Sequence, residues 1–399
     1  MSRLLKHGVI LSLIIHFSLA YQATPHADIG ECGGQPVDPG KQRVWILDNT
    51  AYKTGSGNNQ WRAEYVALYY EKDSGHELLA QVAAKFQPVL DKILGQGSVN
   101  TTTIPPERAQ PFTDCVLFNH TFEMKLGNME AVTLGPSSCQ GMSSTLYDFH
   151  NRNHIDGDVI DCTSNVQSIS VMNSKTVFAE PTGWGVISDI DDTIKITLTN
   201  RPFGYLQTTF FDEAQPVSGM PELYAYINQT LTAPTSAKRP EAGPVFFYLS
   251  TSPLPLYAFF QSFRDRLYPF GTIMLREAGW RNMDGLPASM ADEKEAYKVS
   301  RLDKVHTMFP KRSFILIGDS TESDPEVYGE ISRWYPGWVR GIFIRRVTGV
   351  INVGQSEEEL NSKKRFEQAF RGLDPDSWHV FDNPAEMVPM VEALKKEGL

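Results

Sequence analysis

The hydrophobic and polar positions follow one pattern before about residue 181 and another after it. In the first region, short apolar stretches with interleaved polar positions are separated by clusters of Gly, Asn and Ser, a pattern typical of β-strands and turns. The expected strands are Arg43–Leu47, Glu64–Tyr70, Thr113–Phe122 and Ser168–Phe178, and one helix-like run covers His76–Leu94. This region is therefore predicted to be a β-rich domain.

In the second region, apolar runs of strand length alternate with longer runs of helical period. The expected elements are Gly185–Asp189, Pro221–Leu231, Val245–Ser250, Leu256–Leu267, Glu293–Phe309, Phe314–Asp319, Val339–Val347 and Ala385–Lys396. This alternation predicts an α/β fold, a doubly wound parallel sheet with helices on both faces. We therefore expect a smaller β-rich domain over residues 21–180, followed by an α/β domain over residues 181–399.

The first twenty residues have the pattern of a cleaved secretory signal. Arg3, Lys6 and His7 precede the apolar run Gly8–Ala20, which ends with small residues typical of a cleavage site. The run is shorter than the roughly 20 apolar residues of a spanning helix, so no transmembrane segment is expected. A buried N-terminal helix is the alternative. We expect a secreted chain, with an extracellular or vacuolar destination.

Cysteines and glycosylation motifs fit the same compartment. An even number of cysteines in an exported protein predicts disulfides, and their spacing leaves the pairing open. The four cysteines are Cys32, Cys115, Cys139 and Cys162. The N-x-[ST] motif, which suits a glycosylated surface loop, occurs at Asn100, Asn119 and Asn228. The β-rich domain is therefore expected to be stapled by two disulfides.

The overall charge narrows the classes of partner. The chain carries 37 Lys and Arg against 47 Asp and Glu, a net charge of −10. Such a surface repels polyanions, so a nucleic-acid partner is not expected.

Acidic and hydroxyl residues follow three of the predicted strands. Asp189 and Asp191 end the first strand, Asp319 ends another and is followed by Asp324, and Ser250 ends a third. In open α/β sheets, ligands bind beyond the carboxyl ends of the strands. Two carboxylates about 4 Å apart repel by roughly 4 kcal/mol at an effective dielectric of 20, so ionised neighbours require a cation. Mg²⁺ with oxygen ligands is the natural one.

These motifs carry a family resemblance. DIDDT at 189–193, the strand-end Ser250, a lysine upstream of a strand, and GDSTESD at 318–324 resemble the four motifs of the haloacid-dehalogenase-like (HAD-like) phosphohydrolases. More narrowly, SDIDDTIK at 188–195, GMPELY at 219–224, YLSTSP at 248–253 and ILIGDSTESDPEVY at 315–328 resemble the catalytic domain of the actin-patch-type phosphatidate phosphatases. The resemblance covers about residues 181–399.

The resemblance implies a role for each motif residue. Asp189 would be the nucleophile that forms an aspartyl-phosphate, and Asp191 the general acid and base. Ser250 would hold a phosphoryl oxygen and Lys298 would neutralise the transferring group. Mg²⁺ would be bound by Asp189, the backbone carbonyl of Asp191, Asp319 and Asp324.

Simpler interpretations stand beside these roles. Asp189 and Asp191 could be turn or capping acids, and Ser250 and Asp324 could each cap a following helix. Lys304, on the same predicted helix as Lys298, is the alternative cation.

Substrate size follows from the spacing of the motifs. Asp189 to Ser250 and Ser250 to Lys298 span 61 and 48 residues, which leaves no room for a large cap domain. An open site suits a phosphate on a bulky carrier, such as a lipid at a surface. Aromatic residues expected to touch acyl chains at the rim are Tyr257, Tyr268, Phe270 and Trp280. The stripe of Leu256, Phe259, Phe260, Phe263 and Leu267 is expected to pack in the core, with acyl-chain contact as the alternative.

The expected function is that of a secreted, Mg²⁺-dependent phosphatidate phosphatase that releases diacylglycerol and phosphate, with peripheral contact to a lipid surface. One alternative is a phosphatase of soluble phosphomonoesters or phosphoproteins. The other is a secreted binding protein on the same scaffold, without catalysis. Fold-level analogy does not establish the substrate.

Overall fold

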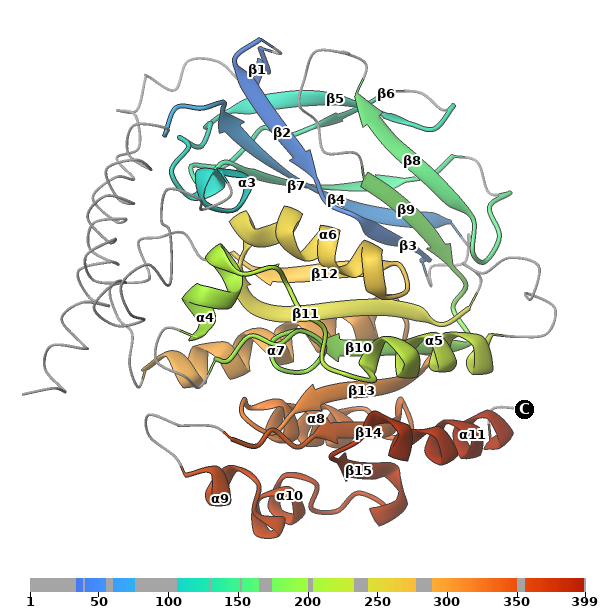
Figure 1. Cartoon of the computed structure of the whole chain (residues 1–399). Helices are drawn as coiled ribbons and strands as arrows, with labels where there is room; N and C mark the ends of the chain where they lie inside the picture. Colours follow the sequence, from blue (N-terminus) through green and yellow to red (C-terminus); the bar gives the residue numbers. More distant parts are fainter. Residues whose placement is uncertain are drawn as a thin grey trace, which may run out of the picture.

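The computed structural model describes eleven stretches of the chain, in which two β-sheets lie on either side of helix α6 (Figure 1). The described residues are 34–38, 40–54, 60–75, 106–128, 131–150, 153–164, 174–199, 204–232, 243–277, 289–349 and 356–397. The predicted signal, the helix-like run at 76–94, Cys32, Asn100 and Trp280 fall outside them. In the described part, no helix is both long and apolar enough to cross a membrane.

The N-terminal region is a nine-stranded mixed sheet, so the prediction of β-rich structure is confirmed. Its strand order is β1-β5-β8-β9-β3-β4-β2, with β6 paired to β5 and β7 paired to β4. The strands are β1 (Gln35–Pro36), β2 (Gln42–Ile46), β3 (Asn49–Lys53), β4 (Trp61–Glu71), β5 (His120–Leu126), β6 (Ala131–Leu134), β7 (Met142–Asp148), β8 (Val159–Ser164) and β9 (Ser174–Ala179).

One predicted strand of this sheet was largely misplaced. The segment expected as a strand from Thr113 follows a short helix, α3 (Pro106–Ala109), and the 3₁₀ turn Gln110–Phe112, and strand β5 begins only at His120. Thr113 donates its backbone N–H to Gln110 O at 2.8 Å, so its hydrogen bond closes a turn and is not available to a neighbouring strand.

The cysteine prediction is wrong for this structure. Cys115 and Cys139 are exposed free thiols, and Cys162 is a buried free thiol. Two bridges among four cysteines require at least one bond among these three, and none is formed. Cys162 lies inside the sheet on β8, where its Sγ is 3.4 Å from Thr176 Oγ1. The sheet is therefore held by its hydrophobic core rather than by disulfides among the described cysteines.

The glycosylation motif at Asn228 does not lie in a surface loop. Asn228 is within helix α5 (Met220–Leu231), where its carbonyl accepts a hydrogen bond from Thr232 N at 3.2 Å. Thr230, the hydroxyl residue of the motif, is buried in the same helix.

The C-terminal region contains a six-stranded, wholly parallel sheet, which confirms the α/β prediction. Its order is β12-β11-β10-β13-β14-β15. The strands are β10 (Trp184–Asp189), β11 (Val245–Pro253), β12 (Gly271–Arg276), β13 (Ser313–Asp319), β14 (Val339–Arg345) and β15 (Trp378–Phe381). Because the strands are parallel, their carboxyl ends all lie at one edge of the sheet, toward α4 (Gly204–Leu206) in Figure 1.

Helices cover both faces of this sheet, as the alternation in sequence predicts. Successive residues of a strand point to opposite faces. Val186 thus packs in one core with α5, α6 (Tyr257–Leu267) and α11 (Val388–Glu397), whereas Ile187 packs in another with α7 (Ser289–Met308), α8 (Asp324–Trp334) and α10 (Lys363–Ala369). The remaining short elements are the π-turn Gln207–Phe211, the 3₁₀ turns Leu254–Leu256, Pro375–Ser377 and Pro384–Met387, and α9 (Glu357–Leu360).

The two sheets share one hydrophobic core. Trp45 and Leu68, from the N-terminal sheet, pack in the same cluster as Phe260 and Phe263 of α6. The predicted apolar stripe on α6 is therefore core, with Leu256, Phe260 and Phe263 buried and Phe259 and Leu267 packed against the cluster.

Candidate active site

The candidate site lies where the strand order of the parallel sheet reverses. β10 is the central strand, with β11 on one side and β13 on the other. The chain leaves β10 for β11 and later returns to the opposite side as β13, so the connections diverge at the carboxyl ends of β10 and β13. Such a switch point is where open α/β sheets bind ligands.

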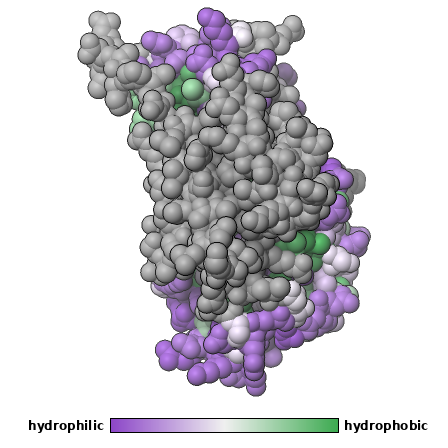
Figure 2. All heavy atoms as spheres, turned by 60° about the vertical axis from the view of Figure 1, so that its left-hand side comes forward, coloured by the Kyte–Doolittle hydropathy of each residue, from purple (hydrophilic) through white to green (hydrophobic). Residues whose placement is uncertain are grey.

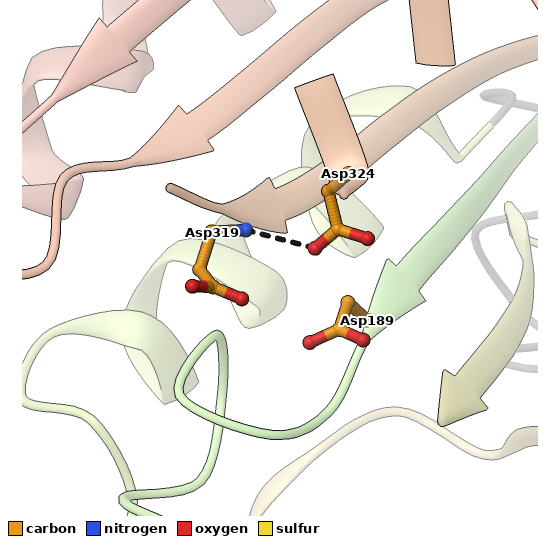
Figure 3. A group of neighbouring side chains, drawn as sticks. All are labelled: Asp189, Asp319 and Asp324. Carbon is orange, nitrogen blue, oxygen red and sulfur yellow. Dashed lines mark hydrogen bonds between the residues drawn. The ribbon is translucent and has the colours of Figure 1, made fainter. Parts of the chain in front are cut away.

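Three aspartates gather at this edge of the sheet (Figure 3). Asp189 ends β10, Asp319 ends β13, and Asp324 is the first residue of α8. All three are buried, and one carboxylate oxygen from each lies within 4.8 Å of the others. Asp324 Oδ2 accepts a hydrogen bond from Asp319 N at 3.1 Å, which fixes the start of α8 against the end of β13.

Gly318 makes this close approach feasible. A Cβ atom at that position would lie 2.6 Å from the Asp324 carboxylate, inside any ordinary contact distance. The glycine of the GDSTESD motif is therefore required by the position of Asp324.

Lys298 places its ammonium in direct contact with these acids, whereas Lys294 lowers the pKa of the neighbouring Glu322 by charge alone. Lys298 Nζ lies 2.8 Å from Asp189 Oδ1 and 2.9 Å from Glu322 Oε2, and it also donates to Asp324 Oδ1. The side chain is completely buried on α7. One cation thus faces three carboxylates.

The pKa shifts follow from burial and crowding of charge. Burial raises the pKa of Asp189 well above its usual value, Lys298 opposes this shift, and the neighbouring Asp324, Glu322 and Asp319 add to it. Burial and the Asp324 and Glu322 carboxylates also raise the pKa of Asp319. Burial opposes the charge on Lys298, but Asp189 and Asp324 outweigh burial and raise its pKa.

The acid cluster fits a divalent cation. Asp319 Oδ1 accepts hydrogen bonds from the backbone and side chain of Thr321, but Asp319 Oδ2 is buried without any hydrogen-bond partner. A buried carboxylate oxygen without a partner costs free energy, and an oxygen-only donor set suits Mg²⁺. Asp189, Asp319 and Asp324 are the side chains that could hold such an ion. The Asp191 carboxylate is outside this group.

Asp191 instead points into a ring of hydroxyl groups. Its Oδ1 accepts from Thr197 Oγ1 at 2.9 Å, and its Oδ2 accepts from Ser250 Oγ at 2.5 Å and from Ser252 Oγ at 3.1 Å. Ser250 lies in the last part of β11 (Val245–Pro253), just after the regular pairing with β12 ends at Leu249, and its hydroxyl contacts Asp191, two residues beyond the end of β10. The two predicted residues Asp191 and Ser250 are therefore in direct contact.

The turn after β10 is built by its own polar side chains. Thr193 Oγ1 donates to Asp189 Oδ2 at 2.9 Å, which orients that carboxylate from the side opposite Lys298. Asp192 adopts φ 57°, a left-handed conformation that aspartate tolerates better than most residues. Its carboxylate accepts from the backbone N–H groups of Leu198 and Thr199 at 2.8 and 2.9 Å. The DIDDT sequence thus encodes the shape of the turn as well as its acids.

The structure decides between Lys298 and Lys304, and it tests whether Asp324 and Ser250 are helix caps. Lys304 contacts Glu64 of β4, away from the cluster, so Lys298 is the lysine at the site. The N-cap residue of α8 is Ser323, and no side chain caps that helix. Ser250 caps neither the 3₁₀ turn at Leu254 nor α6. Glu322 and Thr197 were missed, because nothing in their spacing distinguished them from neighbouring loop residues.

Two of the aromatic residues expected at the rim, Tyr257 and Tyr268, lie in the core. Tyr257 is fully buried and its hydroxyl accepts a hydrogen bond from the Asp48 backbone N–H at 2.7 Å, and Tyr268 is buried and donates to Ile194 O at 2.8 Å. The Arg264 guanidinium lies over the Phe270 ring, with its Cζ 4.6 Å from the ring centroid. The prediction of acyl-chain contact through Tyr257 and Tyr268 is therefore wrong, because both rings serve helix packing.

Three clustered carboxylates and a lysine thus lie at the switch point of the parallel sheet, where open α/β sheets bind ligands. Comparison with known sequences shows which proteins this part of the chain is similar to. Residues 184–346 match the family model described as phosphatidate phosphatase APP1, catalytic domain. The resemblance predicted from the motifs is confirmed over this range.

Two yeast proteins show the same similarity. Phosphatidate phosphatase APP1 of Saccharomyces cerevisiae is 28% identical over 185 residues, which are 46% of this chain and 29% of that protein. An uncharacterized protein of Schizosaccharomyces pombe is 25% identical over 203 residues, 50% of this chain and 31% of that protein. The chain thus spans less than a third of the length of these relatives.

Proposed function

We propose that this protein is a Mg²⁺-dependent phosphatidate phosphatase, which hydrolyses phosphatidate to diacylglycerol and phosphate. The observation that carries the proposal is the position of Asp189, a buried carboxylate that contacts Lys298 and shares a cluster with the unpartnered Asp319 Oδ2. The match of residues 184–346 to the phosphatidate phosphatase catalytic domain supports the substrate.

In the proposed reaction, the Asp189 carboxylate attacks phosphorus and the bond from phosphorus to the diacylglycerol oxygen breaks. Asp191 protonates the leaving oxygen, then accepts a proton from the water that hydrolyses the aspartyl-phosphate. The hydrogen bonds from Lys298 and Thr193 support the role of Asp189 as nucleophile, since they hold its two carboxylate oxygens in a fixed orientation.

Two further residues bind the phosphoryl group. Ser250 donates a hydroxyl hydrogen bond to a phosphoryl oxygen, and the Lys298 ammonium neutralises charge that develops during transfer. Asp189, Asp319 and Asp324 would hold Mg²⁺, together with the Asp191 backbone carbonyl. When bound, Mg²⁺ supplies positive charge that offsets the repulsion between the carboxylates and the phosphate.

Phosphate release from a substrate panel tests the proposal. The panel contains phosphatidate in neutral vesicles, lysophosphatidate, 4-nitrophenyl phosphate, nucleotides and phosphopeptides, each with Mg²⁺ and with chelator. We expect phosphatidate to be the best substrate, with no release by Asp189→Asn. Preference for soluble esters would replace the lipid assignment with a general phosphatase. No release from any substrate would leave a binding protein on this scaffold.

We also propose that the chain enters the secretory pathway, which the charge and apolar pattern of residues 1–20 supports. N-terminal sequencing of protein recovered from the medium or a vacuolar fraction tests this. A mature N-terminus following Ala20 is expected, and retention of residues 1–20 in a cytosolic fraction would contradict it.

A further inference from the structure

Lys195 is a buried lysine for which the proposed reaction has no role. Its side chain is completely buried, and its Nζ lies 5.5 Å from the centroid of the Phe259 ring. Nζ donates to Thr197 Oγ1 at 3.1 Å and, more weakly, to Ile196 O at 3.4 Å. No carboxylate in the described part of the chain lies within ion-pair distance of it. Burying an ammonium with so few hydrogen-bond partners costs free energy, which suggests that Lys195 has a function beside the site.

The hydrogen bond from Lys195 to Thr197 determines which way the Thr197 hydroxyl donates. An ammonium can only donate, so the Thr197 hydroxyl accepts from Lys195 and keeps its single proton for another acceptor. Asp191 Oδ1 is the nearer of its two acceptors, at 2.9 Å against 3.3 Å for Lys195 O. Lys195, Thr197 and Asp191 thus form a directional chain of two hydrogen bonds.

These two hydrogen bonds fix the Oδ1 side of the Asp191 carboxylate. Ser250 and Ser252 donate to Oδ2, and Thr197 alone donates to Oδ1 among the described residues. Ser250 is also the proposed phosphoryl ligand, so its bond to Asp191 competes with substrate. When Ser250 turns to the phosphoryl group, Thr197 and Ser252 are left to hold the orientation of the carboxylate.

The backbone holds Lys195 in register with Asp191. Lys195 N donates to Ile190 O at 3.0 Å, and Asp192 N donates to Lys195 O at 2.8 Å. Lys195 is therefore fixed to the same tight turn that follows β10, and its ammonium reaches the Thr197 hydroxyl from there.

We propose that Lys195 is a positioning residue, which orients the general acid Asp191 through the Thr197 hydroxyl. This inference rests on the proposed function, in which Asp191 protonates the leaving oxygen. Protonation matters most when the leaving group is a poor one. We call the hydrogen bonds from Lys195 to Thr197 and from Thr197 to Asp191 the relay. Its loss is therefore expected to slow the hydrolysis of alkyl phosphates, such as phosphatidate or lysophosphatidate, more than that of 4-nitrophenyl phosphate.

Two pairs of variants test the relay with full-length protein. Thr197→Val removes the hydroxyl and keeps the shape of the side chain, whereas Thr197→Ser keeps the hydroxyl. Lys195→Met removes the donor and keeps the length, and Lys304→Met is its control on a lysine distant from the acid cluster. We expect Thr197→Val and Lys195→Met to lower kcat for an alkyl phosphate by about 10- to 100-fold, with KM little changed, and to lower it less for 4-nitrophenyl phosphate. Thr197→Ser and Lys304→Met are expected to retain most activity.

A double-mutant cycle separates positioning from a structural role. If Lys195 acts through Asp191, Lys195→Met should add almost nothing to the loss caused by Asp191→Asn, measured with 4-nitrophenyl phosphate. Additive losses, or equal losses for good and poor leaving groups, would overturn the inference.

Crystal structures of wild type, Lys195→Met and Thr197→Val give a readout that does not need turnover. We expect the Asp191 carboxylate to rotate away from its wild-type orientation in both variants. An unchanged carboxylate would overturn the relay, even if the wild-type enzyme hydrolyses every ester tested. A rotated carboxylate would support it, even if no substrate in the panel turns over and the proposed function fails.

Discussion

The ammonium of Lys298 lies 2.8 Å from Asp189 Oδ1, although 109 positions separate the two residues in sequence. One comes from helix α7 and the other from the end of β10, so only the folded sheet brings them together. The same ammonium contacts Glu322 and Asp324, and Asp319 completes a cluster of four carboxylates around one lysine. This excess of negative charge destabilises the fold, and a bound cation would reduce that cost.

Replacing the proposed nucleophile separates its role in the reaction from its role in folding. Asp189→Asn keeps the shape of the side chain but cannot attack phosphorus, so turnover is expected to fall by about 10⁴-fold or more. Its melting temperature should stay at or above that of wild type. The exposed Asp382, which pairs with Arg346, provides the control Asp382→Asn with normal activity. Substantial turnover by folded Asp189→Asn would remove Asp189 as the nucleophile.

Asp319 is expected to show a trade-off between stability and activity. Its Oδ2 is buried without a partner, and burial raises its pKa. Asp319→Asn removes that charge and should stabilise the metal-free protein by about 1 kcal/mol, while it abolishes Mg²⁺-dependent activity. Denaturant titration in excess chelator measures the difference. A destabilised variant would mean that the Asp319 charge is already compensated without metal.

Proton release should accompany metal binding. Burial raises the pKa values of Asp189, Asp319 and Asp324; neighbouring carboxylates add to the rise, and Lys298 opposes it for Asp189 and Asp324. Between the usual carboxyl pKa and these raised values, the folded protein binds more protons than the unfolded chain. Their contribution to metal-free stability therefore falls as pH rises through this interval, and metal affinity rises, because the ion displaces protons.

Calorimetric titration with Mg²⁺ in buffers of different ionisation enthalpy measures the protons released. Affinity that increases with pH, with a proton release that diminishes toward high pH, is the expected result. Affinity independent of pH across the same range would show that the three carboxylates are already ionised before the metal binds.

Contact with the N-terminal sheet is expected to stabilise the C-terminal α/β region. Arg264 of α6 donates to Asp48 Oδ2 at 2.7 Å, and both side chains are only 2% exposed. Arg264→Ala leaves Asp48 buried and without its charge partner, so it should destabilise the protein by about 3 to 5 kcal/mol. Arg266→Ala, on the same helix but in an exposed pair with Glu213, should cost about 1 kcal/mol or less. Equal losses of unfolding free energy would contradict this coupling.

Strand-end chemistry could be predicted from sequence because it is local. A buried run followed at once by an acid, as at Asp189 and Asp319, marks both the strand and the edge where it ends. The shared core could not be predicted, since Tyr257 and Tyr268 have the same pattern whether they face lipid or another sheet. Glu322 and Thr197 were missed for a related reason. Their contacts with Lys298 and Asp191 depend on loop conformation, which the period of hydrophobic residues does not predict.

The last prediction concerns how phosphatidate reaches the site. The net charge of −10 opposes docking on an anionic bilayer. On the face shown in Figure 2 the described residues are mostly hydrophilic, with small hydrophobic areas. Near the site, Ile196 is a large apolar side chain exposed to 38%, beside the turn that holds Asp191 and Thr197.

Lipid contact should therefore depend on a few apolar groups rather than on charge attraction. Raising the mole fraction of phosphatidate in neutral vesicles, at constant bulk concentration, should increase the rate. Adding an anionic lipid that is not a substrate should decrease it, most strongly at low salt. Ile196→Ser should lower the rate on vesicles severalfold and leave 4-nitrophenyl phosphate hydrolysis nearly unchanged. If the vesicle rate depends only on bulk phosphatidate, and Ile196→Ser slows both substrates equally, the enzyme does not work at the lipid surface through this residue.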